Sequence, residues 1–218
     1  MSVRENREKM DCIVAYRPLA GLSRARLGER WLHVLPRAKR AAVETAADPV
    51  AIATLAGIDL LAHGLGAIGG GELTAGMLAY PSRGKPLLGQ GPDFSISHTG
   101  GFAVCAVARE SRVGIDIEVL ARVRPESLRR VAHPTELERF AADPYGAAKL
   151  WTRKEAVLKA AGASIFDAAA VEVEEGHADF HGERWYFSGP EVLDGCALAI
   201  AGERPHMSVD LRLAGELA

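Results

Sequence analysis

Between Val113 and Val119 the chain alternates aliphatic and acidic residues, which is typical of a β-strand with two different faces. Asp116 and Glu118 would leave the same face while their aliphatic neighbours pack on the other, with the two Cα atoms about 6.6 Å apart. Two carboxylates brought to about 4 Å repel by about 4 kcal/mol at an effective dielectric near 20. Because a cation removes that cost, the pattern predicts a metal-binding strand. The ordinary alternative is an edge strand whose acids face solvent.

A second acidic motif follows with helical spacing. Trp151, Glu155 and Lys159 are four residues apart, so they share one face of the helix expected over residues 144–161. Glu155 could reach the same cation as the strand, and Lys159, one turn later, could reach a phosphate. Oxygen ligands without nearby Cys or paired His favour a hard ion, Mg²⁺ or Mn²⁺. A plain Glu-to-Lys helix pair explains the same spacing without a metal.

Two further segments carry polar side chains that suit an anion. Ser97, His98 and Thr99 precede a Gly-Gly turn, where backbone N–H groups and hydroxyls can hold a phosphate. Residues 83–86, with the sequence RGKP, form a basic turn in which Lys85 can point at a phosphate or an adenine edge. A His satisfied within the protein and a tetrapeptide occurring by chance are the alternatives.

Taken together, the order and spacing of these four segments resemble the surfactin-type class of 4′-phosphopantetheinyl transferases. The resemblance covers about residues 83–162 and comprises the GKP sequence at 84–86, Ser97 with His98, the GIDIE sequence at 114–118, and the helix from Trp151 to Lys159 followed by Gly162. Outside this region the similarity is looser, through a first strand ending at residues 16–19 and a basic segment at 36–40.

The resemblance implies that 4′-phosphopantetheine is transferred from coenzyme A to a serine of an acyl or peptidyl carrier protein, releasing 3′,5′-adenosine bisphosphate. It implies Mg²⁺ as the ion, with Mn²⁺ as an alternative, and a role in polyketide or nonribosomal peptide synthesis. Asp116, Glu118 and Glu155 would bind the metal that bridges the coenzyme A pyrophosphate. Such a displacement needs positioning and charge neutralisation more than covalent help from the protein.

The same resemblance assigns the remaining roles. Glu155, or a water that it orients, would be the base for the incoming serine, and Lys159 would contact the pyrophosphate, so these are the expected catalytic residues. The other side chains expected to contact coenzyme A are Thr54 and His98 at the 3′-phosphate, Lys85 and Ser97 near the adenosine half, and Lys39 as a further phosphate contact.

The chain departs from the family pattern at two positions. Where many relatives carry a second Lys in the basic segment and an Arg before the helical Thr, this chain has Ala42 and Ala53. The 3′-phosphate site would then hold less positive charge, although Lys39, Arg40 or Arg37 could compensate.

Helical and extended patterns come in blocks, which indicates an α+β fold. The resemblance implies two similar α+β halves, a pseudo-dimer with the active site in the cleft between them: residues 1–110 on the coenzyme A adenosine side, and 111–218 with the metal site and the lysine helix. No internal repeat is detectable in the sequence. We expect strands at 12–18, 93–97, 102–108, 113–119, 169–175, 184–188, 196–201 and 207–212, and helices at 23–34, 36–46, 49–63, 125–132, 134–142 and 144–161.

Net charge and composition limit the classes of molecule that the chain is expected to bind. A net charge of -2 and a pI of about 6.4 argue against a general nucleic-acid binder. An arginine cluster directly after the acidic strand could steer an acidic carrier protein, although a solvated helix face explains it equally well. Its members are Arg122, Arg124, Arg129 and Arg130.

Other features suggest the compartment. The 3 cysteines form no Cys-x-x-Cys motif, and the first residues are polar without a secretory pattern, so we expect a reducing, cytoplasmic location. The apolar stretch from Pro49 to Gly71 contains Asp59 and His63, which favours a buried helix over a membrane span. We therefore expect a monomer that uses coenzyme A and a carrier protein and binds no membrane.

Two other classes of function remain open. A serine hydrolase could use Ser97, His98 and Asp116, but no nucleophile-elbow pattern is present. A non-catalytic coenzyme A or nucleotide-binding module would need the phosphate-binding cations but not the three acids.

Overall fold

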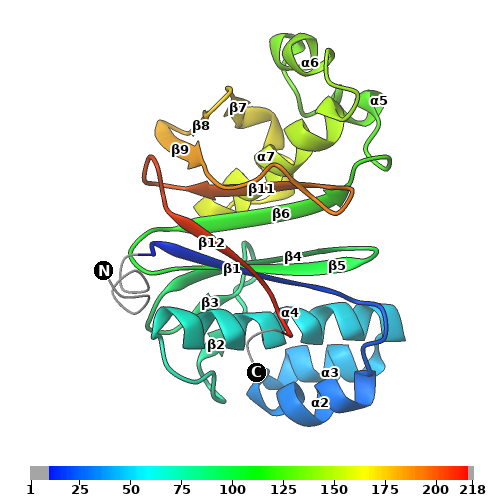
Figure 1. Ribbon diagram of the computed structural model, residues 1–218, viewed down its shortest axis with the longest axis vertical. Coiled ribbons are helices and arrows are strands. Elements are labelled where there is room, and N and C mark those ends of the chain that lie inside the picture. The colour runs from blue at the N-terminus through cyan, green and yellow to red at the C-terminus, as the bar shows by residue number, and fades with distance from the viewer. Residues whose placement is uncertain (1–9, 216–218) are drawn as a thin grey trace.

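The computed structural model describes residues 10–215, which form two β-sheets stacked on each other with helices on the outer sides (Figure 1). The first sheet has the strand order β12-β1-β5-β4, with bounds Cys12–Pro18 (β1), Asp93–Thr99 (β4), Phe102–Ala108 (β5) and Val209–Leu213 (β12). The second sheet contains Val113–Val119 (β6), Glu172–Val173 (β7), His177–Phe180 (β8), Glu183–Phe187 (β9), Val192–Leu193 (β10) and Cys196–Gly202 (β11). A small hairpin joins Leu78–Ala79 (β2) to Leu87–Leu88 (β3).

The helices lie on opposite outer sides of the two sheets. Arg24–Trp31 (α2), Arg37–Thr45 (α3) and Asp48–Ile68 (α4) lie on the outer side of the first sheet, together with a 3-10 turn at Leu32–Val34. Pro125–Leu128 (α5), Pro134–Phe140 (α6) and Gly146–Ala161 (α7) lie on the side of the second sheet, followed by a 3-10 helix at Ile165–Ala170. This mixture of helices and antiparallel strands confirms the α+β class.

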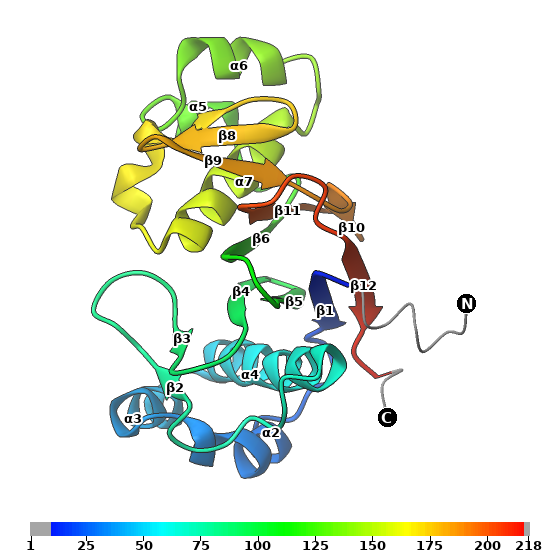
Figure 2. The same cartoon turned by 90° about the vertical axis from the view of Figure 1, so that its left-hand side faces the viewer.

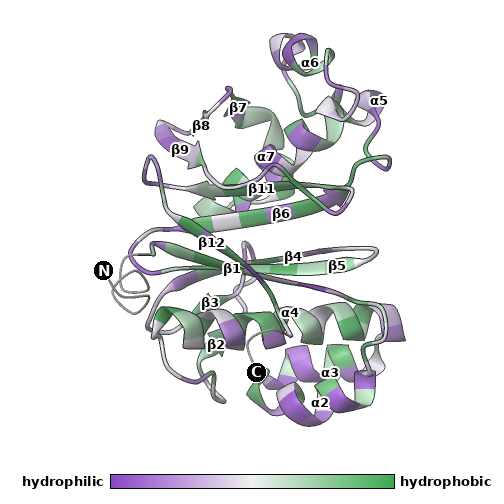
Figure 3. Cartoon of the chain, in the orientation of Figure 1, coloured by the Kyte–Doolittle hydropathy of each residue, from purple (hydrophilic) through white to green (hydrophobic). Residues whose placement is uncertain are grey.

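Three hydrophobic clusters hold the layers together. One lies between the first sheet and its helices and includes Leu61 and Phe94, and a second lies between α7 and the second sheet and includes Val157 and Trp185. The third lies between the two sheets. It is made by aliphatic side chains of β1, β5, β6 and β11, such as Val14, Val104, Ile115, Ile117 and Ile200. Figure 3 shows β5 and β6 as largely hydrophobic ribbons at this junction.

The long helix α4 is the central helix of the first layer. By length and composition it could span a membrane, but 67% of its most apolar window is buried inside the protein. Gly57 and Gly64 allow it to approach the sheet, because an added Cβ would lie 2.6 Å from Ile96 and 2.5 Å from Val107. The helix predicted over 49–63 is thus confirmed as buried and continues to Ile68, where Gly69 in the left-handed region ends it.

Most of the other expected elements are also confirmed, and the differences lie mainly after α7. The strand predicted at 169–175 is wrong, since a 3-10 helix occupies residues 165–170 and only Glu172–Val173 is extended. Residues 177–180, which are not among the expected strands, form β8. Short strands between Gly-rich turns give little periodicity, which is why the sequence did not separate them.

The last strand crosses between the two layers. β12 pairs in parallel with β1, with Cys12 opposite Val209 and Tyr16 opposite Leu213. The first sheet therefore contains a strand from the carboxy-terminal end of the chain. Any division of the chain near residue 110 has to assign β12 to the first layer.

One close contact fixes the second layer. A Cβ added to Gly114 in β6 would lie 1.9 Å from the carbonyl oxygen of Ala156 and 2.5 Å from the nitrogen of Ala160, both in α7. These are backbone atoms of a helix interior, which cannot move aside individually. Only glycine at this position lets α7 lie directly on β6.

We therefore expect Gly114→Ala to lower the free energy of unfolding by about 3 kcal/mol or more, because the helix must move away from the strand. Urea unfolding followed by circular dichroism measures the change. Gly66→Ala in α4 is the matched control, since nothing lies within 4 Å of its added Cβ. It should be neutral or stabilising by up to about 1 kcal/mol. Equal stabilities for the two variants would contradict the close-contact interpretation.

Candidate active site at the junction of β4, β6 and α7

Three polar side chains from three elements meet in direct contact. The Lys159 ammonium on α7 donates to Asp116 Oδ1 on β6 at 2.7 Å and to Ser97 Oγ on β4 at 2.9 Å. Ser97 Oγ also donates to Asp116 Oδ1 at 2.7 Å. Asp116 is only 4% exposed, so this lysine compensates a carboxylate that is largely removed from water. The predicted convergence of β6 and α7 is therefore present in the structure.

The other two predicted metal ligands lie at the same junction. Glu118, two residues after Asp116 on the same face of β6, accepts a long hydrogen bond from Thr99 Oγ1 at 3.4 Å. Burial, and next the negative charge of Asp116, raise the pKa of Glu118 and also the pKa of Glu155 on α7. Glu118 adds a smaller upward contribution at Glu155, whereas Lys159 lowers both values. Arg122 also lowers the pKa of Glu118. The three acids thus repel one another, and Lys159 together with Arg122 compensates them only in part.

This excess of negative charge fits a bound cation. Asp116 Oδ2 is buried and has no hydrogen-bond partner among residues 10–215, which is costly for a carboxylate oxygen unless a ligand satisfies it. Within residues 10–215 no three His, Cys, Asp or Glu side chains are already gathered closely enough to hold an ion. Lys159, instead of a third acid, lies against Asp116. The donor set therefore fits a hard cation. Glu118 and Glu155 would approach such a cation by rotation of their side chains.

The predicted coenzyme A residues come from the first layer. His98 follows Ser97 on β4, Thr54 lies half-buried on α4, and Lys39 lies on α3 with its ammonium 5.4 Å from the ring centroid of Tyr80. His98 is exposed at its surface, yet the protein atoms around its ring, and next the charge of Lys159, lower its pKa. Lys39 contributes weakly in the same direction. His98 and Lys39 are therefore electrostatic neighbours of the Lys159 site.

Lys85 occupies a different environment from the one expected at an adenosine-binding position. Its side chain is 7% exposed, and its ammonium contacts Asp93 Oδ2 at 2.5 Å and the carbonyl of Val113 at 2.6 Å. Burial lowers the pKa of Lys85, and Asp93 opposes that shift. Two of its three N–H donors are thus used inside the protein, and its place near the adenosine half of coenzyme A stays a prediction.

The departures at Ala42 and Ala53 also have a structural basis. Ala53 is 4% exposed inside the first layer, so a longer side chain there would need the surrounding helices to move. Ala42 is exposed on α3.

Sequence reasoning missed a buried ion pair that supports α7. Lys154 and Glu136 have side chains only 1% and 4% exposed, with Nζ and Oε2 2.8 Å apart. Lys154 also donates to the carbonyl of Val171, while Glu136 accepts from Val173 N at 2.7 Å. The available signal was helical phase, since Lys154 falls four residues after the buried Leu150. The pair ties α6 and the segment after α7 to the helix that carries Glu155 and Lys159.

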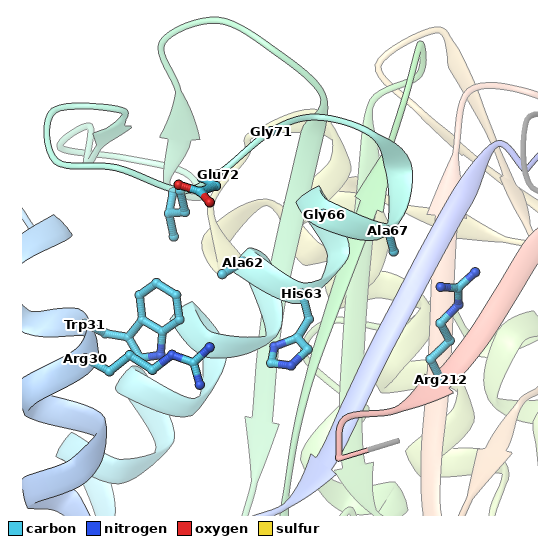
Figure 4. Close-up of a pocket in the computed structure, with 10 residues that line it drawn as sticks. Arg30, Trp31, Ala62, His63, Gly66, Ala67, Gly71, Glu72 and Arg212 are labelled. Carbon is cyan, nitrogen blue, oxygen red and sulfur yellow. The ribbon is translucent and has the colours of Figure 1, made fainter. Parts of the chain in front are cut away.

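Several cavities in the described part of the chain are lined by residues other than the predicted site residues. Figure 4 shows one of about 510 Å³, lined by Arg30 and Trp31 of α2, His63 of α4, Glu72 and Arg212 among others. Nearby Asp59 binds Arg17 and accepts from Trp31 Nε1 at 2.8 Å, so its charge is already compensated. The acidic junction is therefore identified by its own contacts and charge, independently of these cavities.

The geometry disfavours the hydrolase alternative. Ser97 Oγ donates to Asp116 and accepts from Lys159, so His98 does not activate it as a base would. His98 follows Ser97 on the same strand, and neighbouring strand residues point to opposite faces.

Comparison with known proteins gives an independent result. Residues 112–189 match the family model of the 4′-phosphopantetheinyl transferase superfamily. The chain is 38% identical over 106 residues to the 4′-phosphopantetheinyl transferase HetI of Nostoc sp., a match that covers 43% of this chain and 45% of that protein. It is 30% identical over 104 residues to the 4′-phosphopantetheinyl transferase AcpT of Salmonella typhimurium, covering 44% and 54% of the two chains. The chain thus spans about half the length of the curated relatives it matches.

The lowered pKa of His98 can be measured directly. We expect NMR titration to place it below 6.5, and Lys159→Met to raise it, because the variant removes a nearby positive charge. Since folded His98 binds fewer protons than unfolded His98, its contribution to the free energy of unfolding falls as the pH drops below about 6.5. Lys149→Met, at the opposite end of α7, is the control and should leave the titration unchanged. An unshifted His98 in both variants would show that Lys159 does not act on it.

Proposed function

We propose that this chain, which belongs to the 4′-phosphopantetheinyl transferase superfamily, transfers 4′-phosphopantetheine from coenzyme A to a serine hydroxyl of a carrier protein. The observation that carries this proposal is the contact of Lys159 with Asp116, within the region that matches the family. Three acids and one lysine at the meeting point of a strand and a helix suit displacement at a pyrophosphate, which needs charge neutralisation and alignment.

We assign the acidic residues to a divalent ion. Asp116, through its unpartnered Oδ2, with Glu118 and Glu155 would hold Mg²⁺, with Mn²⁺ as the alternative. When bound, such an ion neutralises negative charge on the pyrophosphate oxygens and orients them. The raised pKa values of the two glutamates indicate that their ionised forms gain from a nearby positive charge.

The chain's own residues would then align the reactants and move one proton. Lys159 would donate to a phosphate oxygen, and Glu155 would accept the proton of the serine hydroxyl, directly or through a water. The serine oxygen forms a bond to the phosphorus that carries pantetheine, and the bond from that phosphorus to the bridging oxygen breaks, releasing 3′,5′-adenosine bisphosphate. A base of this kind contributes about 10²- to 10⁴-fold in rate.

Coenzyme A would bind across the two layers. Ser97 and His98 on β4, with Thr54 on α4 and Lys39 on α3, would receive the adenosine and 3′-phosphate on the side of the first sheet. We propose that Lys85 supports the protein instead of binding the ligand, since its ammonium is already paired.

The finer assignment to the surfactin-type class is also our proposal. Each layer has a sheet covered by one long helix, α4 or α7, which supports a pseudo-dimer with the active site between the halves. We extend the proposal to a cytoplasmic monomer that serves polyketide or nonribosomal peptide carriers. The described cysteines, Cys12, Cys105 and Cys196, are all free and buried, which suits a reducing compartment.

The decisive assay is the mass of an apo carrier protein after incubation with coenzyme A and Mg²⁺. The wild type should add one phosphopantetheine arm per carrier, and the addition should stop when the metal is chelated. We expect Asp116→Ala and Glu155→Ala to lower the rate by at least about 100-fold while remaining folded, because each removes a ligand for the cation. Glu175→Ala is the matched control, because Glu175 is exposed and forms no ion pair with the part of the chain that the structure describes.

The outcomes separate the three functions. Near-normal transfer by both acid variants would refute the metal site. Tight coenzyme A binding without any mass gain would favour the non-catalytic module, and release of an acyl product without mass gain would favour a hydrolase.

The arginine cluster after β6 provides a test of carrier recognition. Arg122, Arg124, Arg129 and Arg130 are exposed, and none of them forms an ion pair with a residue in the described range 10–215. The guanidinium of Arg122 lies against Gly100, at the turn that follows β4. Free cations beside the acidic junction would attract an acidic carrier over a distance of about 10 Å at moderate salt.

Charge reversal tests this attraction. We expect Arg129→Glu/Arg130→Glu to raise the KM for an acidic carrier about 10-fold at low salt, without changing the KM for coenzyme A. The control Arg26→Glu/Arg184→Glu changes the net charge equally on α2 and β9. An unchanged carrier KM in the first variant, or an equal rise in both, would exclude steering by this cluster.

A further inference from the structure

The strand that carries Asp116 and Glu118 has an open edge. Among the strands of the described range, β6 pairs with β11 alone, in antiparallel register with Asp116 opposite Ala199. In an antiparallel strand the N–H and C=O groups of each residue point to the same side, and successive residues point to opposite sides. Alternate residues of β6 therefore direct their backbone groups away from β11. A buried edge of this kind needs other partners.

Side chains of β4 supply partners for the N–H groups. Val113 N donates to Asp93 Oδ2 at 2.8 Å, and Ile115 N donates to Ser95 Oγ at 3.1 Å. Asp93 and Ser95 are two residues apart, so they leave the same face of β4. Ser95 is 0% exposed, which shows that water does not compete for this hydrogen bond.

Two lysines supply partners for the C=O groups of the same residues. Lys85 donates to the carbonyl of Val113 at 2.6 Å, and Lys159 donates to the carbonyl of Ile115 at 3.2 Å. Val113 and Ile115 therefore have both backbone groups satisfied by side chains instead of by a neighbouring strand. The positive charge of Lys85 is balanced by Asp93. The Asp93 carboxylate thus accepts hydrogen bonds from both the Lys85 ammonium and the Val113 N–H.

The same row of side chains leads into the acidic junction. Next along the face of β4 are Ser97, which donates to Asp116, and Thr99, which donates to Glu118. Lys85 is held from a second side, because Gly84 packs directly against Gly162 at the end of α7, where an added Cβ would lie 2.7 Å from the Gly162 carbonyl oxygen. Figure 2 shows the loop between β2 and β3 extending toward the second layer.

We propose that Asp93, Ser95 and Lys85 are positioning residues, which hold the open edge of β6 against β4 so that Asp116 and Glu118 keep a fixed register with Ser97 and His98. This inference rests on the proposed function, because its consequence is alignment of the two ends of coenzyme A. A displacement of about 1 Å in a catalytic group can lower a rate by about 10²-fold. The three residues would act through Asp116 and Glu118.

Hydrogen exchange of backbone amides tests the hydrogen bonds themselves. In Ser95→Ala we expect the Ile115 amide to exchange at least about 10-fold faster, because its side-chain acceptor is lost. The amides of Gly114 and Asp116 face β11 and should keep their rates. Ser188→Ala is the matched control, since it removes a buried hydroxyl that has no hydrogen-bond partner within the described residues, and it should leave all of these amides unchanged.

Kinetics test the positioning role on the same proteins. We expect Ser95→Ala and Asp93→Asn to lower kcat about 10- to 100-fold while the KM for coenzyme A changes less than about 3-fold, because the contacts to substrate remain. Asp93→Asn retains an acceptor of the same shape, so it keeps the test open if Ser95→Ala does not fold. Ser188→Ala should keep the kcat of the wild type.

Each result is decisive. Faster exchange at Ile115 together with the kcat loss supports the proposal. Unchanged exchange at Ile115 would show that Ser95 does not cap the edge, and faster exchange with an unchanged kcat would show that the cap does not position the site. Absence of transfer by the wild type would instead refute the proposed function, while the exchange data would still decide whether β4 caps β6.

Discussion

The contact of α7 with β6 at Gly114 is the constraint on which the rest of the site depends. A side chain at this position would hold the helix away from the strand, because an added Cβ would overlap the Ala156 carbonyl. Only at this short separation can Lys159 reach both Asp116 and the carbonyl of Ile115. Gly114 thus matters because it has no side chain. Its absence lets the charged side chains of β6 and α7 come into direct contact.

The junction between the two layers combines two kinds of contact, and β6 contributes to both. The side chains of Ile115 and Ile117 enter the hydrophobic cluster between the sheets, whereas the edge and the opposite face of the strand carry polar contacts to β4 and α7. Apolar burial holds the two sheets together but does not fix their relative position. The hydrogen bonds of Asp93 and Ser95 specify the register of β6 against β4. This division explains how a buried edge without a strand partner remains in one position.

The electrostatics of the site favour a bound cation. Burial and mutual repulsion raise the pKa values of Glu118 and Glu155, and the positive charges of Lys159 and Arg122 only partly offset the three acids. The structure therefore carries an excess of negative charge where the proposed reaction handles a pyrophosphate, itself an anion. A divalent cation resolves both problems together, since it relieves repulsion among the carboxylates and between them and the substrate.

The sequence alone determined the elements that carry the site. Alternation placed Asp116 and Glu118 on one face of a strand, and four-residue spacing placed Glu155 and Lys159 on one face of a helix, because these periods are local properties of the backbone. Only the tertiary structure decided that Lys85 serves the edge of β6, that Lys154 is buried with Glu136, and that β12 joins the first sheet. Each of these contacts depends on residues that are distant along the chain. The periodicity of a single segment does not specify which distant groups will pack beside it.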